Sequence, residues 1–150
     1  MVAYAGERCV EEVARVPPHY FTREDVNRLI PRLAELIPQI REARRLLIER
    51  ERALGRVVAQ PPQTNGFRIE QENQANALKV EADTTMAQFR ALAQEIADMG
   101  AELKDPESGL VDFLALRNGR EVYLCWREGE PDCAWWHDLD TGFAGRQPLP

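Results

Sequence analysis

The feature that most constrains the fold is an apolar seam that keeps its phase through residues 22–59. Its side chains alternate spacings of four and three residues, which is typical of a narrow, coiled-coil-like stripe on an α-helix. Two charged residues, Arg44 and Glu51, interrupt the seam. The pattern predicts one long helix over 22–59. The seam positions are Val26, Ile30, Leu33, Ile37, Ile40, Arg44, Leu47, Glu51, Leu54 and Val58.

The start of this helix carries signals of its own. Thr22 and Asp25 fit a capping box in which aspartate replaces the usual glutamate. Phe21 and Val26 occupy the two positions of a hydrophobic staple. The predicted helix therefore begins at residue 22.

Two prolines, Pro31 and Pro38, lie on one face inside the pattern. Each removes a backbone N–H donor and crowds the preceding turn, so we expect the helix to kink or restart there. The alternative is a short first helix that ends before Pro31, with the main helix beginning at that proline. The apolar seam keeps its phase in both cases.

A second helical pattern follows a short loop marked by Pro61, Pro62, Asn65 and Gly66. Residues 68–104 resume the three-and-four spacing, so both helices would be about 55 Å long at about 1.5 Å per residue. Residues 22–60 carry nine basic and six acidic side chains, whereas residues 61–104 carry four basic and seven acidic ones. Matched lengths, a short connection and opposite charges favour an antiparallel hairpin.

The last part of the chain predicts a sheet. Asn118 and Gly119 separate two apolar runs, which is a strong β-hairpin signal, and residues 132–138 return as a third strand. The predicted class is α+β, a long antiparallel helical hairpin followed by a small three-stranded antiparallel β-meander over 109–150. A two-residue turn pairs Val111 with Trp126, Phe113 with Leu124 and Ala115 with Val122 on one face, which should cover the helices.

The opposite face of this sheet is not plainly polar. Leu114, Leu116, Tyr123 and Cys125 project from it in the same register. We therefore expect something to cover this face.

Composition excludes several classes of protein. The net charge of -6 and the pI near 5.0 argue against a surface that neutralises nucleic-acid phosphates. No run reaches the roughly 18 apolar residues of a membrane span, and residues 1–6 are not followed by the apolar core of a signal peptide. Three scattered cysteines without a C-x-x-C motif predict reduced thiols. We expect a cytoplasmic protein without nucleic-acid or membrane partners.

Several blocks of sequence resemble a known family. They are residues 20–31 (YFTREDVNRLIP), 103–113 (LKDPESGLVDF), 122–130 (VYLCWREGE), 136–137 (WH) and 142–146 (GFAGR). Together they resemble the bacterial domain-of-unknown-function family 2203 over residues 20–149. The resemblance implies one family domain over 20–150, which contains the helices predicted from periodicity over 22–59 and 68–104, and it leaves an N-terminal extension over 1–19. It implies no chemistry, because the family is named for having no assigned activity.

The first candidate site is a metal or acid–base site around His137. Imidazole and carboxylates are ligands for zinc, manganese or iron, so the possible cofactor is a divalent metal. Cys133 lies about 13 Å from His137 along one strand, so the two cannot share an ion unless the strand bends. Alternatively, His137 caps the sheet by bonding a carboxylate, and the aspartates are solvated. The candidate ligands are His137, Asp138, Asp140, Asp112 and Glu130.

A second candidate is a thiol pair, since Cys125 and Cys133 face each other in one plausible register. Inert packing of buried cysteines is the alternative that we favour. A third candidate is an arginine stripe that could hold an acidic partner or an anion, unless neighbours such as Glu49 pair with it. Its members are Arg41, Arg45, Arg52 and Arg56.

Two functions follow from these patterns. Two helices about 55 Å long share only a narrow seam, so we expect a non-enzymatic interaction or scaffold protein that self-associates through its helical hairpin. The simplest partner is a second copy in a homodimeric four-helix bundle. The alternative is a metal-binding enzyme or sensor with its site at the C-terminal sheet around His137.

Overall fold

The computed structural model describes residues 17–61 and 64–150. It contains two long helices, α1 (Arg23–Val58) and α2 (Asn65–Asp98), followed by a five-stranded antiparallel sheet. The strands are β1 (Ala101–Asp105), β2 (Leu110–Arg117), β3 (Arg120–Arg127), β4 (Trp135–Asp138) and β5 (Gln147–Pro148), with a short 3-10 helix η1 (Phe143–Gly145) before the last. The predicted α+β class is confirmed, but the prediction of three strands is wrong.

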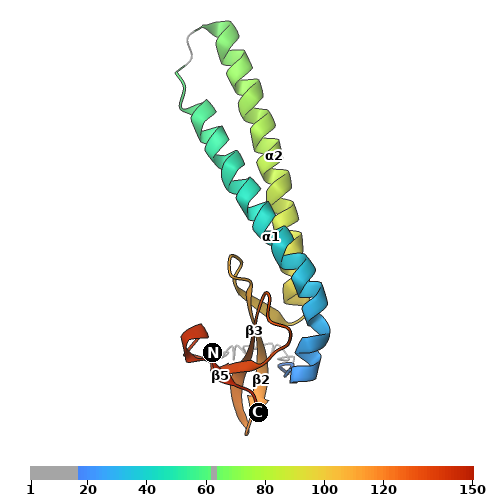
Figure 1. Cartoon of the computed structure of the whole chain (residues 1–150). Helices are drawn as coiled ribbons and strands as arrows, with labels where there is room; N and C mark the ends of the chain where they lie inside the picture. Colours follow the sequence, from blue (N-terminus) through green and yellow to red (C-terminus); the bar gives the residue numbers. More distant parts are fainter. Residues whose placement is uncertain (1–16, 62–63) are drawn as a thin grey trace, which may run out of the picture.

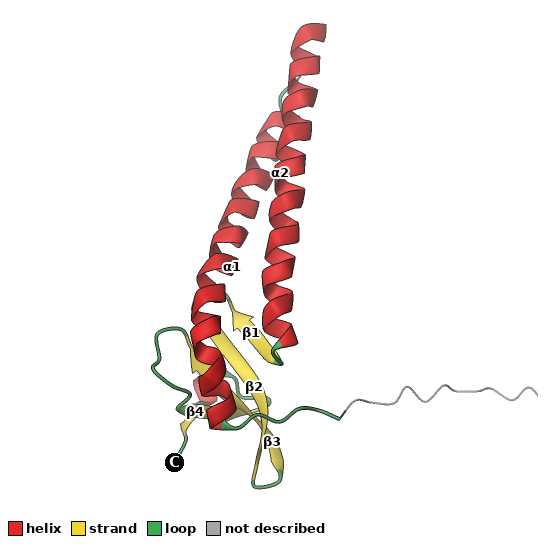
Figure 2. Ribbon diagram, turned by 90° about the vertical axis from the view of Figure 1, so that its right-hand side faces the viewer, coloured by secondary structure: helices red, strands yellow, loops and turns green. Residues whose placement is uncertain are grey.

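The helical hairpin projects from the sheet. Figure 1 shows the first half of α1 lying beside the strands, while both helices continue side by side well beyond them. Figure 2, a quarter turn away, shows β1 starting at the base of α2. The sheet therefore supports one end of the hairpin and leaves the other end packed only on itself.

The start of α1 agrees with the sequence prediction. The Thr22 hydroxyl accepts a hydrogen bond from the Asp25 backbone N–H, and the Asp25 carboxylate accepts one from the Thr22 backbone N–H. Phe21 is buried and packs edge-on against Phe113, with ring centroids 5.2 Å apart. This contact joins the chain before the helix to the sheet.

The prediction of one long helix is confirmed, and the alternative of a separate short helix before Pro31 is wrong, because α1 runs through Pro31 and Pro38. Each internal proline costs about 3 kcal/mol, but each fully buried aliphatic side chain stabilises the fold by about 1.5–3 kcal/mol. Burial against the sheet therefore holds the helix together across both prolines. The fully buried residues of this stretch are Val26, Leu33, Leu36, Ile37 and Ile40.

The second helix begins and ends earlier than predicted. Thr64 caps it by accepting a hydrogen bond from the Phe67 backbone N–H, so Asn65 and Gly66 form its first turn instead of breaking it. At the other end Gly100 adopts a φ of +79, which glycine tolerates best. The helix predicted to residue 104 therefore stops at Asp98, and Ala101 starts β1 opposite Phe113.

The strand register of the predicted hairpin is confirmed. Val111 pairs with Trp126, Phe113 with Leu124, and Ala115 with Val122. These side chains form the inner face of the sheet and pack on the first half of α1. The core they build includes Phe21, Val26, Leu33, Leu36, Ile37, Ile40, Ile96, Cys133 and Trp136.

The sequence also predicts an N-terminal extension and no membrane-spanning run. Most of the predicted N-terminal extension, residues 1–16, lies outside the described residues. Within residues 17–61 and 64–150, no helix is both long enough and apolar enough to cross a membrane.

Candidate functional site

Three buried polar side chains meet on the outer face of the sheet, opposite the helices. Asp112 on β2 and Cys125 on β3 are cross-strand neighbours, and His137 on β4 pairs with Tyr123 on β3. Because side chains alternate along a strand, this register places all three residues on the same face. We call them the Asp–Cys–His cluster.

The three side chains are close enough to bind one ion. Nε2 of His137 lies 3.1 Å from Oδ2 of Asp112. One ligand atom from each residue, including the Cys125 sulfur, lies within 4.8 Å of the other two. Asp112 and His137 are each 2% exposed and Cys125 is fully buried. The cluster is therefore almost completely shielded from water.

A backbone hydrogen bond fixes how the histidine ring is protonated. Nδ1 of His137 lies 2.7 Å from the carbonyl oxygen of Asp138, which can only accept, so Nδ1 carries the proton. Neutral His137 then presents the lone pair of Nε2 to the carboxylate of Asp112, and both groups are acceptors. Their contact requires either an extra proton or a cation between them.

The Asp112 carboxylate has a second unmet requirement. Its other oxygen, Oδ1, is buried and has no hydrogen-bond partner. A buried acceptor without a partner costs about 1–3 kcal/mol, and more when it is charged. Asp112 thus keeps one buried oxygen, Oδ1, directed into the cluster without a well-formed hydrogen bond.

The thiol of Cys125 is unsuited to act as a nucleophile. Burial, followed by the charge and hydrogen bonding of Asp112, raises its pKa far above the usual range. The reactive form of cysteine is the thiolate, which forms in electropositive, accessible surroundings. A buried thiol beside a carboxylate ionises readily only when a metal ion takes the place of its proton.

One wall of the cluster is built by Arg146. Its guanidinium binds both carboxylate oxygens of Glu130 at 2.8 and 2.7 Å and donates to the Cys125 carbonyl oxygen at 3.2 Å. It also stacks over the ring of Trp135, 5.1 Å from the ring centroid. This network holds the segment after β4 against β3, close to Cys125.

The structure brings together two of the five predicted metal ligands. Asp112 and His137 are in contact, but Asp138 pairs with Arg120 and Glu130 pairs with Arg146. Asp140 lies exposed in the turn after β4 and outside the cluster. The contact between His137 and a carboxylate matches the alternative prediction, although that carboxylate is buried instead of solvated.

Sequence reasoning missed Cys125 as a neighbour of Asp112 and His137 and compared it with Cys133 instead. Both cysteines are free thiols. Cys133 belongs to the hydrophobic core, and its sulfur approaches the Cys125 backbone carbonyl at 3.9 Å. The predicted β2–β3 register already places Cys125 opposite Asp112, but it does not place His137, which reaches them only through the pairing of β4 with β3.

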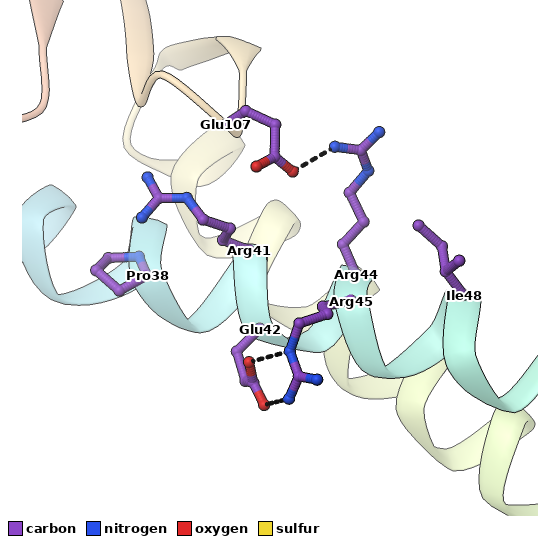
Figure 3. A pocket seen from close by; sticks show the side chains of 7 residues that line it. All are labelled: Pro38, Arg41, Glu42, Arg44, Arg45, Ile48 and Glu107. Carbon is purple, nitrogen blue, oxygen red and sulfur yellow. Dashed lines mark hydrogen bonds and ion pairs between the residues drawn. The ribbon is translucent and has the colours of Figure 1, made fainter.

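Two of the four members of the arginine stripe, Arg41 and Arg45, are paired with acidic side chains. A cavity of about 320 Å³ lies beside α1. Figure 3 shows the side chains that line it, with Arg44 reaching Glu107 and Arg45 reaching Glu42. Arg41, beside them, pairs with Glu128. These partners neutralise the guanidinium groups, so the cavity is not suited to bind an anion. Farther along α1, Arg52 and Arg56 have no ion-pair partner within the described part of the chain.

Comparison with known proteins adds the family. A family model described as an uncharacterized conserved protein, DUF2203, matches residues 19–149. The chain belongs to this family. No curated protein and no solved structure matches the chain significantly. The family match spans both helices and the sheet, so the hairpin and the cluster are parts of one family domain.

Proposed function

We propose that this protein binds a divalent transition metal ion at the Asp–Cys–His cluster. The observation that carries the proposal is that His137 Nε2 lies 3.1 Å from Asp112 Oδ2, with the Cys125 sulfur within 4.8 Å of both, in a buried space. In metal sites, a ligating histidine typically donates its other ring N–H to a carbonyl or carboxylate, as His137 does. A cation between the two acceptors would satisfy both of them.

The donor set selects the kind of metal. Sulfur and imidazole nitrogen favour zinc and similar ions, whereas magnesium and calcium prefer oxygen ligands. Zinc bonds of about 2.0–2.3 Å place tetrahedral ligand atoms about 3.5 Å apart, within reach of the cluster after small side-chain adjustments. Three protein ligands would leave one coordination position for water or another molecule.

The test is metal content and spectroscopy on untagged protein purified without chelator. We expect near-stoichiometric zinc by inductively coupled plasma mass spectrometry. Replacement by Co²⁺ should give thiolate-to-cobalt absorption that disappears in Cys125→Ser. A protein that binds neither ion at micromolar concentration would overturn the proposal.

Asp140→Asn is the matched control for Asp112→Asn. Both substitutions remove one carboxylate, but Asp140 lies outside the cluster. We expect Asp112→Asn to lower zinc affinity by about ten- to a hundredfold or more, in the range seen for changes around metal ligands. Asp140→Asn should bind zinc like the unmodified protein.

A second candidate function is self-association through the helical hairpin. Among the described residues, five of the eight exposed large apolar side chains lie on the part of the hairpin that extends past the sheet: Ile48, Val58, Phe67, Ile69 and Val80. Few residues there are buried. Exposed apolar side chains on both helices of the projecting hairpin favour contact with another protein surface, in the simplest case a second copy.

Sedimentation equilibrium tests the second candidate. The chain has a mass of 17.1 kDa, and we expect a concentration-dependent rise toward twice that value. Val80→Glu should reduce the rise, whereas Leu139→Glu, an exposed leucine outside the hairpin, should not. A monomer at every concentration would exclude self-association.

A further inference from the structure

The N-terminal part of α2, which lies away from the sheet, carries a stripe of charged residues. The order of charges in this stripe is complementary to the same stripe read in the opposite direction. Arg68, Glu72, Lys79 and Asp83 are all exposed, and at 100° per residue they fall within about 60° of one another around the helix. Their signs alternate along the helix. The midpoint of this stripe lies between Ala75 and Asn76, and opposite charges stand at equal distances on its two sides.

The same stripe flanks an apolar line. Ile69 and Val80 are eleven residues apart, which is within about 20° of three full turns, so they share one face of α2. Their side chains are 57% and 64% exposed. The buried residues of this region, Ala82 and Thr85, point about the opposite way around the helix. The face of Ile69 and Val80 is therefore directed away from α1.

We propose that a second copy of this chain docks on this face, with the two α2 helices antiparallel about a two-fold axis near Ala75. The inference rests on the proposed self-association and specifies its surface. A two-fold axis at that point places Arg68 beside Asp83 of the second copy and Glu72 beside Lys79 of the second copy. Ile69 then lies next to Val80 of the second copy.

Charge complementarity is the reason for choosing a second copy as the occupant. In an antiparallel helix pair, a charged stripe on one side of the contact meets the same stripe of the partner in reverse order. The order positive, negative, positive, negative becomes its own complement when it is reversed. The dimer would contain four ion pairs between the copies, two on each side of the axis. All charges of both stripes are then used, so the contact involves two copies and no more.

The shape of the chain permits this contact. The sheet lies at the far end of the hairpin, beside the first half of α1 (Figure 1). An antiparallel pair centred near Ala75 would therefore place the two sheets at opposite ends of a rod. Neither sheet would cover the docking face, and both Asp–Cys–His clusters would stay far from the contact.

Charge reversal and mixing test the arrangement. Glu72→Lys places a lysine against Lys79 of the second copy, and Lys79→Glu places a glutamate against Glu72 of the second copy. We expect each variant alone to raise the dimer dissociation constant about tenfold, because two attractive pairs become repulsive. An equimolar mixture of the two variants should recover the original affinity, since all cross-pairs are then opposite in charge.

Sedimentation velocity over a concentration series provides the measurement, with circular dichroism to confirm equal helix content. Glu51→Lys, the same charge change at an exposed position of α1, should dimerise like the unmodified chain. If the unmodified chain dimerises and the charge variants do so equally well, self-association stands and this surface is wrong. Failure of the mixture to recover affinity also overturns the arrangement. A monomer at every concentration removes both proposals.

Discussion

His137 and Asp112 face each other across β2 and β4 with Nε2 and Oδ2 3.1 Å apart, and both of these atoms are hydrogen-bond acceptors when the ring is neutral. The strand between them, β3, contributes Cys125 to the same buried space. A buried polar arrangement of this kind is costly unless something completes it. The Asp–Cys–His cluster on the outer face of the sheet is therefore the strongest candidate for a functional site.

Replacing Asp112 by asparagine separates the metal proposal from a purely structural role. The asparagine amide can donate to the Nε2 lone pair, so Asp112→Asn should preserve or raise the melting temperature of the metal-free protein. Added zinc should then raise the melting temperature of the unmodified chain but not that of Asp112→Asn. Differential scanning fluorimetry with and without zinc measures both effects. If the variant melts lower and zinc shifts neither protein, the pair is structural.

Removing Arg146 should destabilise the fold. The Arg146 and Glu130 side chains are only 9% and 17% exposed, so Arg146→Ala leaves a largely buried carboxylate unpaired. We expect a loss of about 3 kcal/mol in the free energy of unfolding, measured by urea denaturation. Arg120→Ala, which breaks an ion pair whose arginine is 70% exposed, should lose less than about 1 kcal/mol. Equal losses would contradict this account.

Position 109 requires glycine for two reasons: its backbone φ is positive, and neighbouring atoms leave no room for a Cβ atom. Its φ is +66, and a Cβ there would lie 2.5 Å from Cβ of Glu128. Gly119 has a similar φ of +76 with open space around it. Gly119→Ala should therefore cost about 1–2 kcal/mol for the left-handed conformation alone, and Gly109→Ala should cost distinctly more. Thermal melts of the two variants provide the comparison, and equal costs would show that the loop moves away from the added methyl group.

The capping box of α1 should contribute to the acid sensitivity of the fold. Hydrogen bonds from the Thr22 backbone N–H and hydroxyl lower the pKa of Asp25 in the folded chain. Its contribution to stability is present above the unfolded pKa near 3.8 and is lost as the pH falls through the lower folded value. Asp25→Asn should flatten this acid limb of the stability curve.

Urea denaturation at a series of pH values between neutral and about 2 measures that effect. Asp140→Asn is the control, because the Asp140 carboxylate accepts no hydrogen bond within the described residues. An acid limb that is unchanged in Asp25→Asn would show that the box has no role in acid stability.

Much of the fold could be predicted because its signals are local. The capping box of Thr22 and Asp25, and the turn at Asn118 and Gly119, each depend on residues a few positions apart. The turn also fixed the β2–β3 register, since a one-residue shift would reverse the faces of every side chain. Those elements appear in the structure as expected.

Two errors arose where local pattern and tertiary packing disagree. The apolar spacing of α2 continues through Met99 and Leu103, so periodicity alone cannot separate the end of the helix from β1. The prolines of α1 signal a break, but the sheet buries one whole face of that helix and keeps it continuous. In both places, long-range burial outweighed the local preference.

The sequence by itself determined the two helices, the central hairpin and the face on which each residue of β2 and β3 lies, because those depend on periodicity and turn chemistry. Only the tertiary structure decided that His137 meets Asp112 and Cys125. That meeting requires β4 to pair with β3 in one register, and the loop before β4 is held by the Cys133 backbone N–H donating to the Asn27 side chain at 2.8 Å. Asn27 lies 106 residues away in the chain. A contact at that separation is set by the packing of α1 on the sheet, and no local pattern encodes it.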